Sequence, residues 1–308
     1  MSRDDWDPTA LPSQSGRTIV VTGGNAGIGY FVCEQLARAG ARIVMASRSP
    51  EKAEVASRSI RERIPAAQID FVRLDLSSLA SIREAAADIR KLGPVDVLIN
   101  NAGATTGSSK RAVTEDGLEF VVGSNAFGPF ALTAQVFPSL TPTARIISLG
   151  SMATRLVKLD ASNLQSAHGR YNFFRAYGYS KHAMHAFALE LQRKLSAAGS
   201  EIESILAHPG SAVDLLSDKR ADINDGPVKP LDVLSAVISQ GKDRGAWPIV
   251  RAATDAQAKG GEFYGPHRGV AGRPVVLEPV ASSASEEFGA EFWRQATLAT
   301  AIEFEPGA

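Results

Sequence analysis

The chain has 308 residues, 44% hydrophobic and 21% charged, which is ordinary for a globular protein of one large or two small domains. Basic and acidic residues both number 33, so the formal net charge is zero and no basic field indicates nucleic-acid binding. Cys33 is the only cysteine, which excludes an internal disulfide and a cysteine zinc site and fits a reducing compartment. Without a signal-peptide pattern or a run of about 18 apolar residues, we expect no transmembrane segment and a cytoplasmic location.

A strand, a glycine loop and a helix are the first elements we expect, after a flexible arm over residues 1–16. Residues 17–22 are β-branched and read as a buried strand, and apolar residues at helical spacing follow until Gly40. Glycines allow close approach to the backbone, and a helix N-terminus offers free N–H groups to an anion. The junction therefore predicts a phosphate cradle made of Gly23, Asn25, Gly27, Ile28 and Gly29, with a plain tight turn as the alternative.

The second strand, residues 41–46, ends at Ser47 and Arg48. Enzymes that bind NAD usually place an acidic residue here, where it holds the ribose 2′-hydroxyl. Arg48 instead suits a 2′-phosphate, because its forked donors match the anion. NADP is therefore the favoured cofactor and NAD the less favoured one, while an ordinary solvated arginine is the alternative reading of Arg48.

Further strands alternate with helical segments. Each strand ends in small or polar residues: Asp75 and Leu76 after 69–74, Asn101, Ala102 and Gly103 after 95–99, Ser151 after 145–149, and Pro209 and Gly210 after 202–207. A final strand is expected within 260–265. This alternation predicts an α/β fold with a doubly wound parallel sheet of about seven strands and helices on both faces. Ligands bind at the carboxyl ends of strands in such sheets.

Two helices carry the remaining polar candidates. Residues 114–140 are largely helical, but Asn125 and the nearby Gly123, Gly128 and Pro129 predict a kink or interruption. A second helix begins at Tyr177 and places Lys181 on the same face, four residues later. A neighbouring ammonium lowers the pKa of a phenol, so this pair predicts an acid–base device.

The motifs together resemble the short-chain dehydrogenase/reductase family. They are Thr22–Gly29, Asn100–Gly103, Asn125, Ser151, Tyr177 with Lys181, and Pro209 with Gly210, in the family's order and approximate spacing. The resemblance covers about Arg17 to Gly265. Within the family the chain looks most like the retinol-dehydrogenase-like branch, on Ala176–Lys181, Glu190–Leu195, Ala207–Gly210 and the long gap between Ser151 and Tyr177.

The resemblance implies a role for each residue. Tyr177 would exchange the proton with the substrate, Lys181 would lower the tyrosine pKa and hold the nicotinamide ribose, Ser151 would position the substrate oxygen, and Asn125 would hold a relay water. The glycine loop would bind the pyrophosphate, Asp75 and Leu76 the adenine, and Asn101–Gly103 the adenine ribose side. Pro209 and Gly210 would complete the cofactor site.

The activity implied is an NADP(H)-dependent oxidoreductase of a single Rossmann-type domain over residues 17–308. Substrate-side segments are expected at 152–176, 211–230 and 262–308. Their apolar residues and lack of an arginine cluster favour a hydrophobic carbonyl or alcohol. A catalytically silent NADP-binding sensor or scaffold is the alternative, and a sugar-nucleotide epimerase or dehydratase is a third reading. Relatives often pair through the helices near Asn125 and Tyr177, so a homodimer is possible unless the longer tail covers that face.

Two departures from the family pattern and one histidine pair need comment. Gly150-Ser151 stands where many relatives have two serines, so Ser151 rather than Ser148 is aligned as catalytic. Asp214 lies where a threonine is usual, and it could alter a contact to the cofactor or the substrate loop. His182 and His185 have the spacing of a metal pair, but no third ligand matches, so we expect no metal.

Overall fold

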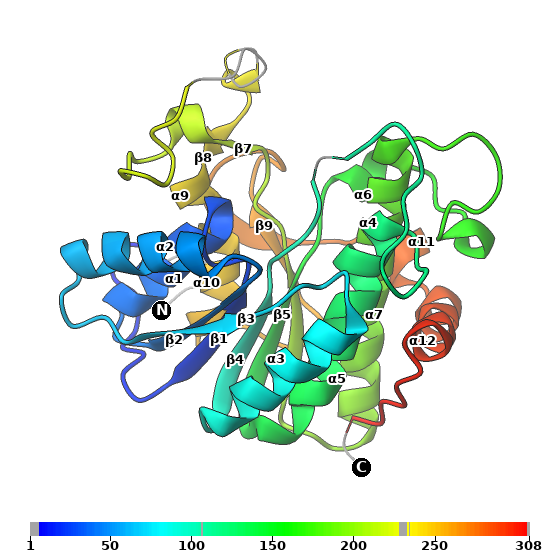
Figure 1. Cartoon of the computed structure of the whole chain (residues 1–308), viewed down its shortest axis with the longest axis horizontal. Coiled ribbons are helices and arrows are strands. Elements are labelled where there is room, and N and C mark those ends of the chain that lie inside the picture. Colours follow the sequence, from blue (N-terminus) through cyan, green and yellow to red (C-terminus); the bar gives the residue numbers. More distant parts are fainter. Residues whose placement is uncertain (1–5, 106, 228–232, 234, 307–308) are drawn as a thin grey trace.

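The computed structural model describes residues 6–105, 107–227, 233 and 235–306, and its centre is an eight-stranded sheet (Figure 1). The strand order is β10-β9-β6-β5-β4-β1-β2-β3, and every neighbouring pair except β9 and β10 is parallel. The chain winds outward from β1 in both directions, which confirms the predicted doubly wound α/β architecture. The strands are β1 Thr18–Thr22, β2 Arg42–Ser47, β3 Ile69–Arg73, β4 Val95–Asn100, β5 Leu140–Leu149, β6 Glu203–Ala207, β9 Phe263–Pro266 and β10 Pro274–Leu277.

Helices cover both faces of the sheet because successive strand residues point to opposite sides. Along β1, Ile19 and Val21 pack into a cluster with α1 (Gly27–Arg38), α2 (Pro50–Arg63) and α10 (Trp247–Thr254). Val20 faces the other side, where it packs with α3 (Leu79–Lys91) and α5 (Gly128–Val136). The longest helix, α7 (Phe173–Ala197), covers the same face as α3 and α5.

The sheet differs from the prediction at two places. Pro274–Leu277 adds an eighth strand, antiparallel to β9, beyond the seven that were expected. Strand β5 begins at Leu140 rather than 145, because Leu140 already pairs with Val95 across a register shift. The preceding helix accordingly begins at Phe120 rather than 114, after an isolated bridge between Val113 and Glu119.

Residues 6–16 pack against the domain, whereas a flexible arm was predicted here. Trp6 and Leu11 pack against the core cluster that holds α1, and Gln14 is buried. The Gln14 backbone N–H donates to the Ala39 carbonyl at 2.7 Å. These contacts tie the segment to the end of α1, while residues 1–5 of the predicted arm lie outside the described part of the chain.

One helical stretch, Phe120–Ser139, is long and apolar enough to span a membrane, with a mean hydropathy of 1.2 over its best window. However, 78% of that window is buried inside the protein. Phe127 and Phe130, for example, pack against α7 and the C-terminal helix. A core helix of a soluble protein passes the same length and composition test.

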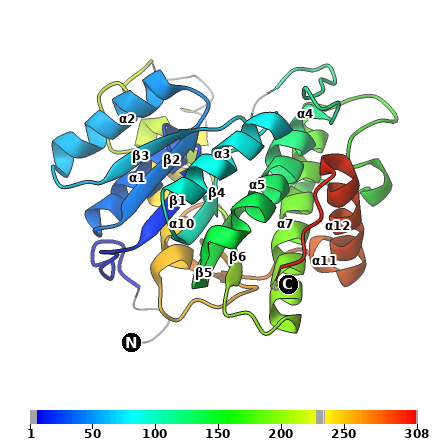
Figure 2. The same ribbon diagram turned by 60° about the horizontal axis from the view of Figure 1, so that its bottom comes forward.

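The C-terminal helix α12 (Glu286–Thr300) lies against α7 and α5, as Figure 2 shows. Phe292 and Trp293 are buried there, and both rings contact Phe130 edge-on, at 6.4 and 5.1 Å between centroids. The tail therefore covers the face through which relatives are expected to pair. A homodimer through α5 and α7 would first have to displace α12.

A small second sheet lies beyond the carboxyl end of the main one (Figure 1). It consists of two parallel strands of two residues, β7 (Ala212–Val213) and β8 (Gln240–Gly241). The Gln240 side chain donates to the Pro209 carbonyl at 2.9 Å. This sheet brings α9 (Lys242–Gly245) next to α1, where the Gln35 amide donates to the Asp243 carbonyl at 2.8 Å.

Candidate active site

The predicted site residues gather at the carboxyl edge of the sheet, and Thr22 at the end of β1 joins two of their loops. Its hydroxyl oxygen accepts the backbone N–H groups of Asn101 and Ala102, at 3.0 and 2.9 Å. The Asn101 amide in turn donates to the Thr22 carbonyl at 2.7 Å. The end of β4 is thereby fixed beside the glycine loop. The sequence motif included Thr22 but gave it no role.

The glycine loop has the backbone that a phosphate cradle requires. Gly23 and Gly27 have positive φ angles of 68° and 58°, which other residues rarely adopt. A Cβ on Gly29 would lie 2.3 Å from the Gly23 carbonyl oxygen, so a side chain there is excluded. Asn25 and Ile28 are half-buried in the same turn. Helix α1 begins at Gly27, and its first N–H groups lie free for an anion.

The predicted adenosine side lies at the ends of β2 and β3. Arg48, the predicted partner of the 2′-phosphate, is exposed just past the end of β2. Asp75 follows β3, and one oxygen of its carboxylate accepts from the backbone and hydroxyl of Ser77 at 2.9 and 2.7 Å. Leu76 is buried. Its carbonyl oxygen lies so close to Gly128 on α5 that a Cβ there would be only 2.5 Å away, which excludes a side chain at that position. Ala102 and Gly103 continue this rim at the end of β4.

Ser151 and Tyr177 are the predicted catalytic pair. Ser151 lies just past the end of β5, whereas Ser148 is fully buried within the strand. Burial raises the pKa of Tyr177, and a hydrogen bond with Ser151 partly opposes that shift. Phe173 stacks on the Tyr177 ring, with centroids 6.4 Å apart and planes at 21°. The site thus holds its phenol in the protonated form.

Lys181 lies one turn after Tyr177 on α7, and its side chain is buried. Its Nζ donates to the Leu149 carbonyl at 2.8 Å and lies 5.8 Å from the centre of the tyrosine ring. Burial lowers the pKa of Lys181 to about 8. The expected lowering of the tyrosine pKa by this ammonium is therefore outweighed here, because desolvation disfavours the charged form of both groups.

Asn125 lies in a π-helical turn, Gly123–Phe127, between α4 (Phe120–Val122) and α5. This confirms the predicted interruption of the helix, and such bulges are frequent at functional sites. The Asn125 side chain accepts from the Ala104 N–H at 2.6 Å and donates to the Ser180 hydroxyl at 3.1 Å. Asn125 therefore links the loop after β4 to the helix that carries Tyr177.

Two buried histidines support the loops after β5 and β6. The Ser151 N–H donates to Nε2 of His185 at 3.3 Å, and the Gly210 N–H donates to Nδ1 of His208 at 3.1 Å. Burial lowers their pKa values to about 3 and about 4, so both rings are neutral acceptors. His185 thus positions Ser151 and does not pair with His182, which contacts Ser283 and Val157 instead.

Gly150 and Gly210 are required by close approaches next to these histidines. A Cβ on Gly150 would lie 2.3 Å from Nε2 of His185. A Cβ on Gly210, whose φ is 71°, would lie 2.2 Å from the Val270 carbonyl oxygen. Pro209 accepts from Gln240, as described above, so the loop after β6 is tied to the small sheet.

The candidate walls of the substrate pocket separate into two groups. Val157 and Leu164 are buried in the core beneath α7, whereas Leu156 and Phe174 are 75% and 50% exposed. A surface pocket also lies in this region, and Phe173, which stacks on the Tyr177 ring, is one of its lining residues. The pocket is lined by Gly107, Ser109, Arg170, Tyr171, Asn172, Phe173, Phe174 and Arg175. Arg170 and Arg175 border this pocket, together with the aromatic rings of Tyr171, Phe173 and Phe174.

The geometry defines the class of protein: a Rossmann-type dinucleotide fold with a Ser, Tyr and Lys set at the carboxyl edge of its sheet. The family model for short chain dehydrogenases matches residues 17–222. The chain belongs to this family, in its retinol-dehydrogenase-like branch, and is an oxidoreductase that uses NAD(P).

The mouse protein polyprenol dehydrogenase is 34% identical, over 95% of this chain and 86% of its own length. Human retinol dehydrogenase 13 is 40% identical over 66% of this chain, which spans 62% of that protein.

Two solved structures are also similar. An uncharacterized protein from Mycobacterium Paratuberculosis is 33% identical, with a TM-score of 0.80 and coverage of 97% of this chain and 98% of that one. The blue fluorescent protein from a metagenomic library, solved in complex with NADPH, is 27% identical with a TM-score of 0.63. That match covers 84% of this chain and 99% of the other.

Proposed function

We propose that the protein is an NADP(H)-dependent oxidoreductase, a carbonyl reductase or alcohol dehydrogenase, with Tyr177 as the acid–base residue. The placement of Ser151 just past β5, close enough to Tyr177 to lower its pKa, with Lys181 one helical turn further along α7, carries the proposal. A bound nicotinamide would supply or accept the hydride. Tyr177 gives its proton to the substrate oxygen, and Ser151 holds that oxygen in place.

In carbonyl reduction Tyr177 would begin as the acid, and in alcohol oxidation its phenolate would be the base. Lys181 would hold the nicotinamide ribose. Its ammonium would also stabilise the negative charge of the Tyr177 phenolate that is left after proton transfer. Asn125 holds the loop after β4 against α7 through its hydrogen bonds to Ala104 and Ser180. A relay water at Asn125, and the reducing, cytoplasmic location that Cys33 suggests, belong to the same proposal.

The direct test is NADPH consumption by the purified protein against a panel of carbonyl compounds. Turnover of at least one apolar aldehyde or ketone is the expected result. NADPH binding without turnover of any carbonyl would favour the silent sensor instead. Preference for sugar nucleotides would favour the epimerase reading.

Cofactor choice gives a second prediction. The protein should bind NADPH more tightly than NADH by roughly 10–150-fold. The reason is that a charge-assisted contact between Arg48 and the 2′-phosphate contributes about 1.5–3 kcal/mol. Replacing Arg48 by Ala should remove most of this preference, chiefly by weakening NADPH. Dissociation constants for both dinucleotides measure it. A wild type that prefers NADH would refute the assignment of Arg48.

Substrate size gives a third prediction. We propose a hydrophobic carbonyl or alcohol of medium to large size, because Ser151 and Tyr177 supply its one polar anchor. In a homologous aldehyde series, kcat/KM should rise by about 0.8 kcal/mol, roughly fourfold, for each buried methylene until the pocket is full. Arg170 and Arg175 line the surface pocket next to Phe173 and could bind an anion. A preference for anionic substrates would contradict the proposal.

A further inference from the structure

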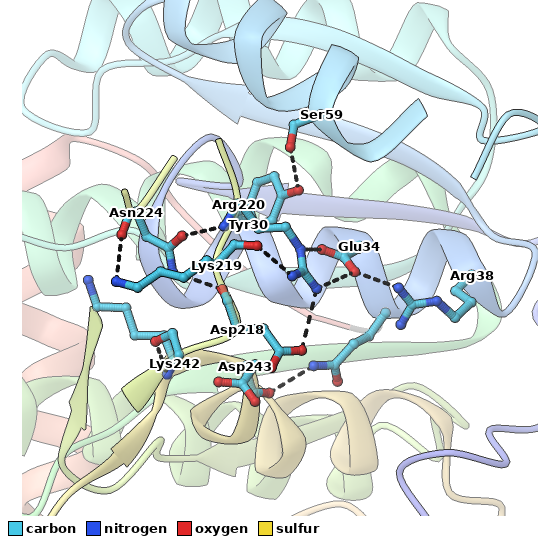
Figure 3. Close-up of polar contacts among 12 residues, drawn as sticks. Tyr30, Glu34, Arg38, Ser59, Asp218, Lys219, Arg220, Asn224, Lys242 and Asp243 are labelled. Carbon is cyan, nitrogen blue, oxygen red and sulfur yellow. Dashed lines mark hydrogen bonds and ion pairs between the residues drawn. The ribbon is translucent and has the colours of Figure 1, made fainter. Parts of the chain in front are cut away.

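Two parts of the chain after β7, one around Arg220 and the other in α9, contact helix α1 through polar groups (Figure 3). Arg220 donates to both carboxylate oxygens of Glu34, at 2.7 and 3.0 Å. One residue further along α1, Gln35 donates to the Asp243 carbonyl at 2.8 Å. Both parts are therefore positioned by the same helix whose N-terminus forms the glycine loop.

Lys242 is the residue that this arrangement brings to the glycine loop. Its backbone N–H donates to the Ser217 hydroxyl at 2.7 Å, which fixes the start of α9. Its Nζ lies 3.9 Å from the position that a Cβ on Gly27 would occupy. Among the described residues outside the local backbone of Gly27, no other heavy atom comes within 4 Å of that position. The space above Gly27 is thus open, and an ammonium group borders it.

The electrostatics of this position favour an anion. The N-terminus of α1, a helix of 12 residues, carries partial positive charge, so a cation beside it is unfavourable without a counter-charge. Nζ of Lys242 pairs with the Asp214 carboxylate at 2.6 Å, and Nζ of Lys219 lies 3.4 Å from the Asp214 carbonyl oxygen. The Lys242 ammonium is therefore paired with the Asp214 carboxylate, whereas the Lys219 ammonium donates to the backbone oxygen of the same residue.

We propose that Lys242 is a cofactor-binding residue that holds the diphosphate of the dinucleotide against Gly27. Asp214 is its counter-charge in the cofactor-free protein, and the diphosphate takes over that role on binding. This inference rests on the proposed function. It also accounts for the departure at Asp214, where the family pattern has a threonine: the carboxylate neutralises the Lys242 ammonium until the cofactor binds.

NADPH and NADH both contain the diphosphate, whereas only NADPH carries the 2′-phosphate. The effects of replacing Lys242 and Arg48 can therefore be distinguished by comparing the two dinucleotides. Replacing Lys242 by Met removes the charge but keeps the length of the side chain. Lys242→Met should weaken NADPH and NADH by the same factor, about tenfold, as expected for a lost charge-assisted contact. Adenosine 2′-phosphate, which lacks the diphosphate, should bind the variant as it binds the wild type.

Three further variants serve as controls. Asp214→Asn removes the competing carboxylate and should leave dinucleotide binding unchanged or tighter, by up to about fivefold. Lys242→Arg keeps the charge and should retain most of the affinity. Lys91→Met removes an exposed charge from α3, which lies on the other face of the sheet, and should change nothing.

Titration of the full-length variants with each nucleotide, with melting curves to establish that they are folded, decides between the outcomes. Equal binding of NADPH and NADH by wild type and Lys242→Met would overturn the inference while leaving the proposed function intact. Weakening by Asp214→Asn to the same extent as Lys242→Met would also overturn it, because only the ion pair would then matter. A wild type that binds neither dinucleotide would overturn the proposed function as well.

Discussion

Tyr177→Phe is expected to reduce kcat by about 10²–10⁴, which is the usual contribution of a positioned acid–base residue. The change removes the hydroxyl that hydrogen-bonds with Ser151 and keeps the ring that stacks on Phe173. Packing of α7 should therefore survive, and the dissociation constant for NADPH should change little. Single-turnover rates with a saturating aldehyde, together with NADPH titration, measure both effects.

Phe173→Leu is a matched control for this prediction. It removes the stacked ring and leaves the Tyr177 hydroxyl and its serine partner in place. Its effect should fall mainly on KM, because Phe173 lines the surface pocket and stacks on the Tyr177 ring. Near-normal turnover in Tyr177→Phe would show that another group donates the proton.

Local chemistry explains why so much of the site was predictable. The glycine loop requires backbone conformations that only glycine adopts easily, so Gly23 and Gly27 are visible in the sequence itself. Tyr177 and Lys181 share a helix face through their spacing alone. The alternation of strands and helices then predicted that the carboxyl ends of the parallel strands lie at one edge of the sheet.

What the sequence did not reveal depends on contacts between distant residues. His185 was considered only for metal binding, because its role as acceptor for Ser151 exists only once α7 packs against the end of β5. Lys242 lies far along the chain from Gly27, and the two meet through strands of only two residues each. Strands that short carry no periodic pattern to detect.

The pKa of Tyr177 in the cofactor-free protein also depends on the whole fold. The spacing to Lys181 predicts attraction between an ammonium and a phenolate, which lowers the tyrosine pKa. Burial is a property of the whole fold, and here it disfavours both charged forms, raising one pKa and lowering the other. The spacing predicts which two residues lie close together, but not the balance between solvation and charge.

A large effect on stability is expected at the buried ion pair between Glu34 on α1 and Arg220 (Figure 3). The Glu34 side chain is 2% exposed and that of Arg220 10%. Arg220→Met should lower the free energy of unfolding by about 3 kcal/mol, because it leaves a buried carboxylate with Arg38 as its remaining partner. Replacing both residues, as Glu34→Gln with Arg220→Met, should recover much of that loss. Arg294→Met, at an exposed pair with Glu291, is the control and should change little.

The pH dependence of unfolding tests the cause of this effect. Burial by itself would raise the Glu34 pKa, but hydrogen bonds from Arg220 and Arg38 outweigh it and hold the pKa below its usual value. A depressed pKa contributes stability above the unfolded value, about 4.3, and that stability is lost as the pH falls through the folded pKa. The difference between wild type and Arg220→Met should therefore be full at pH 7 and shrink in acid, as urea titrations at several pH values would measure. A difference that is the same at every pH would mean that Arg220 stabilises the protein by packing on Phe31 rather than by its charge.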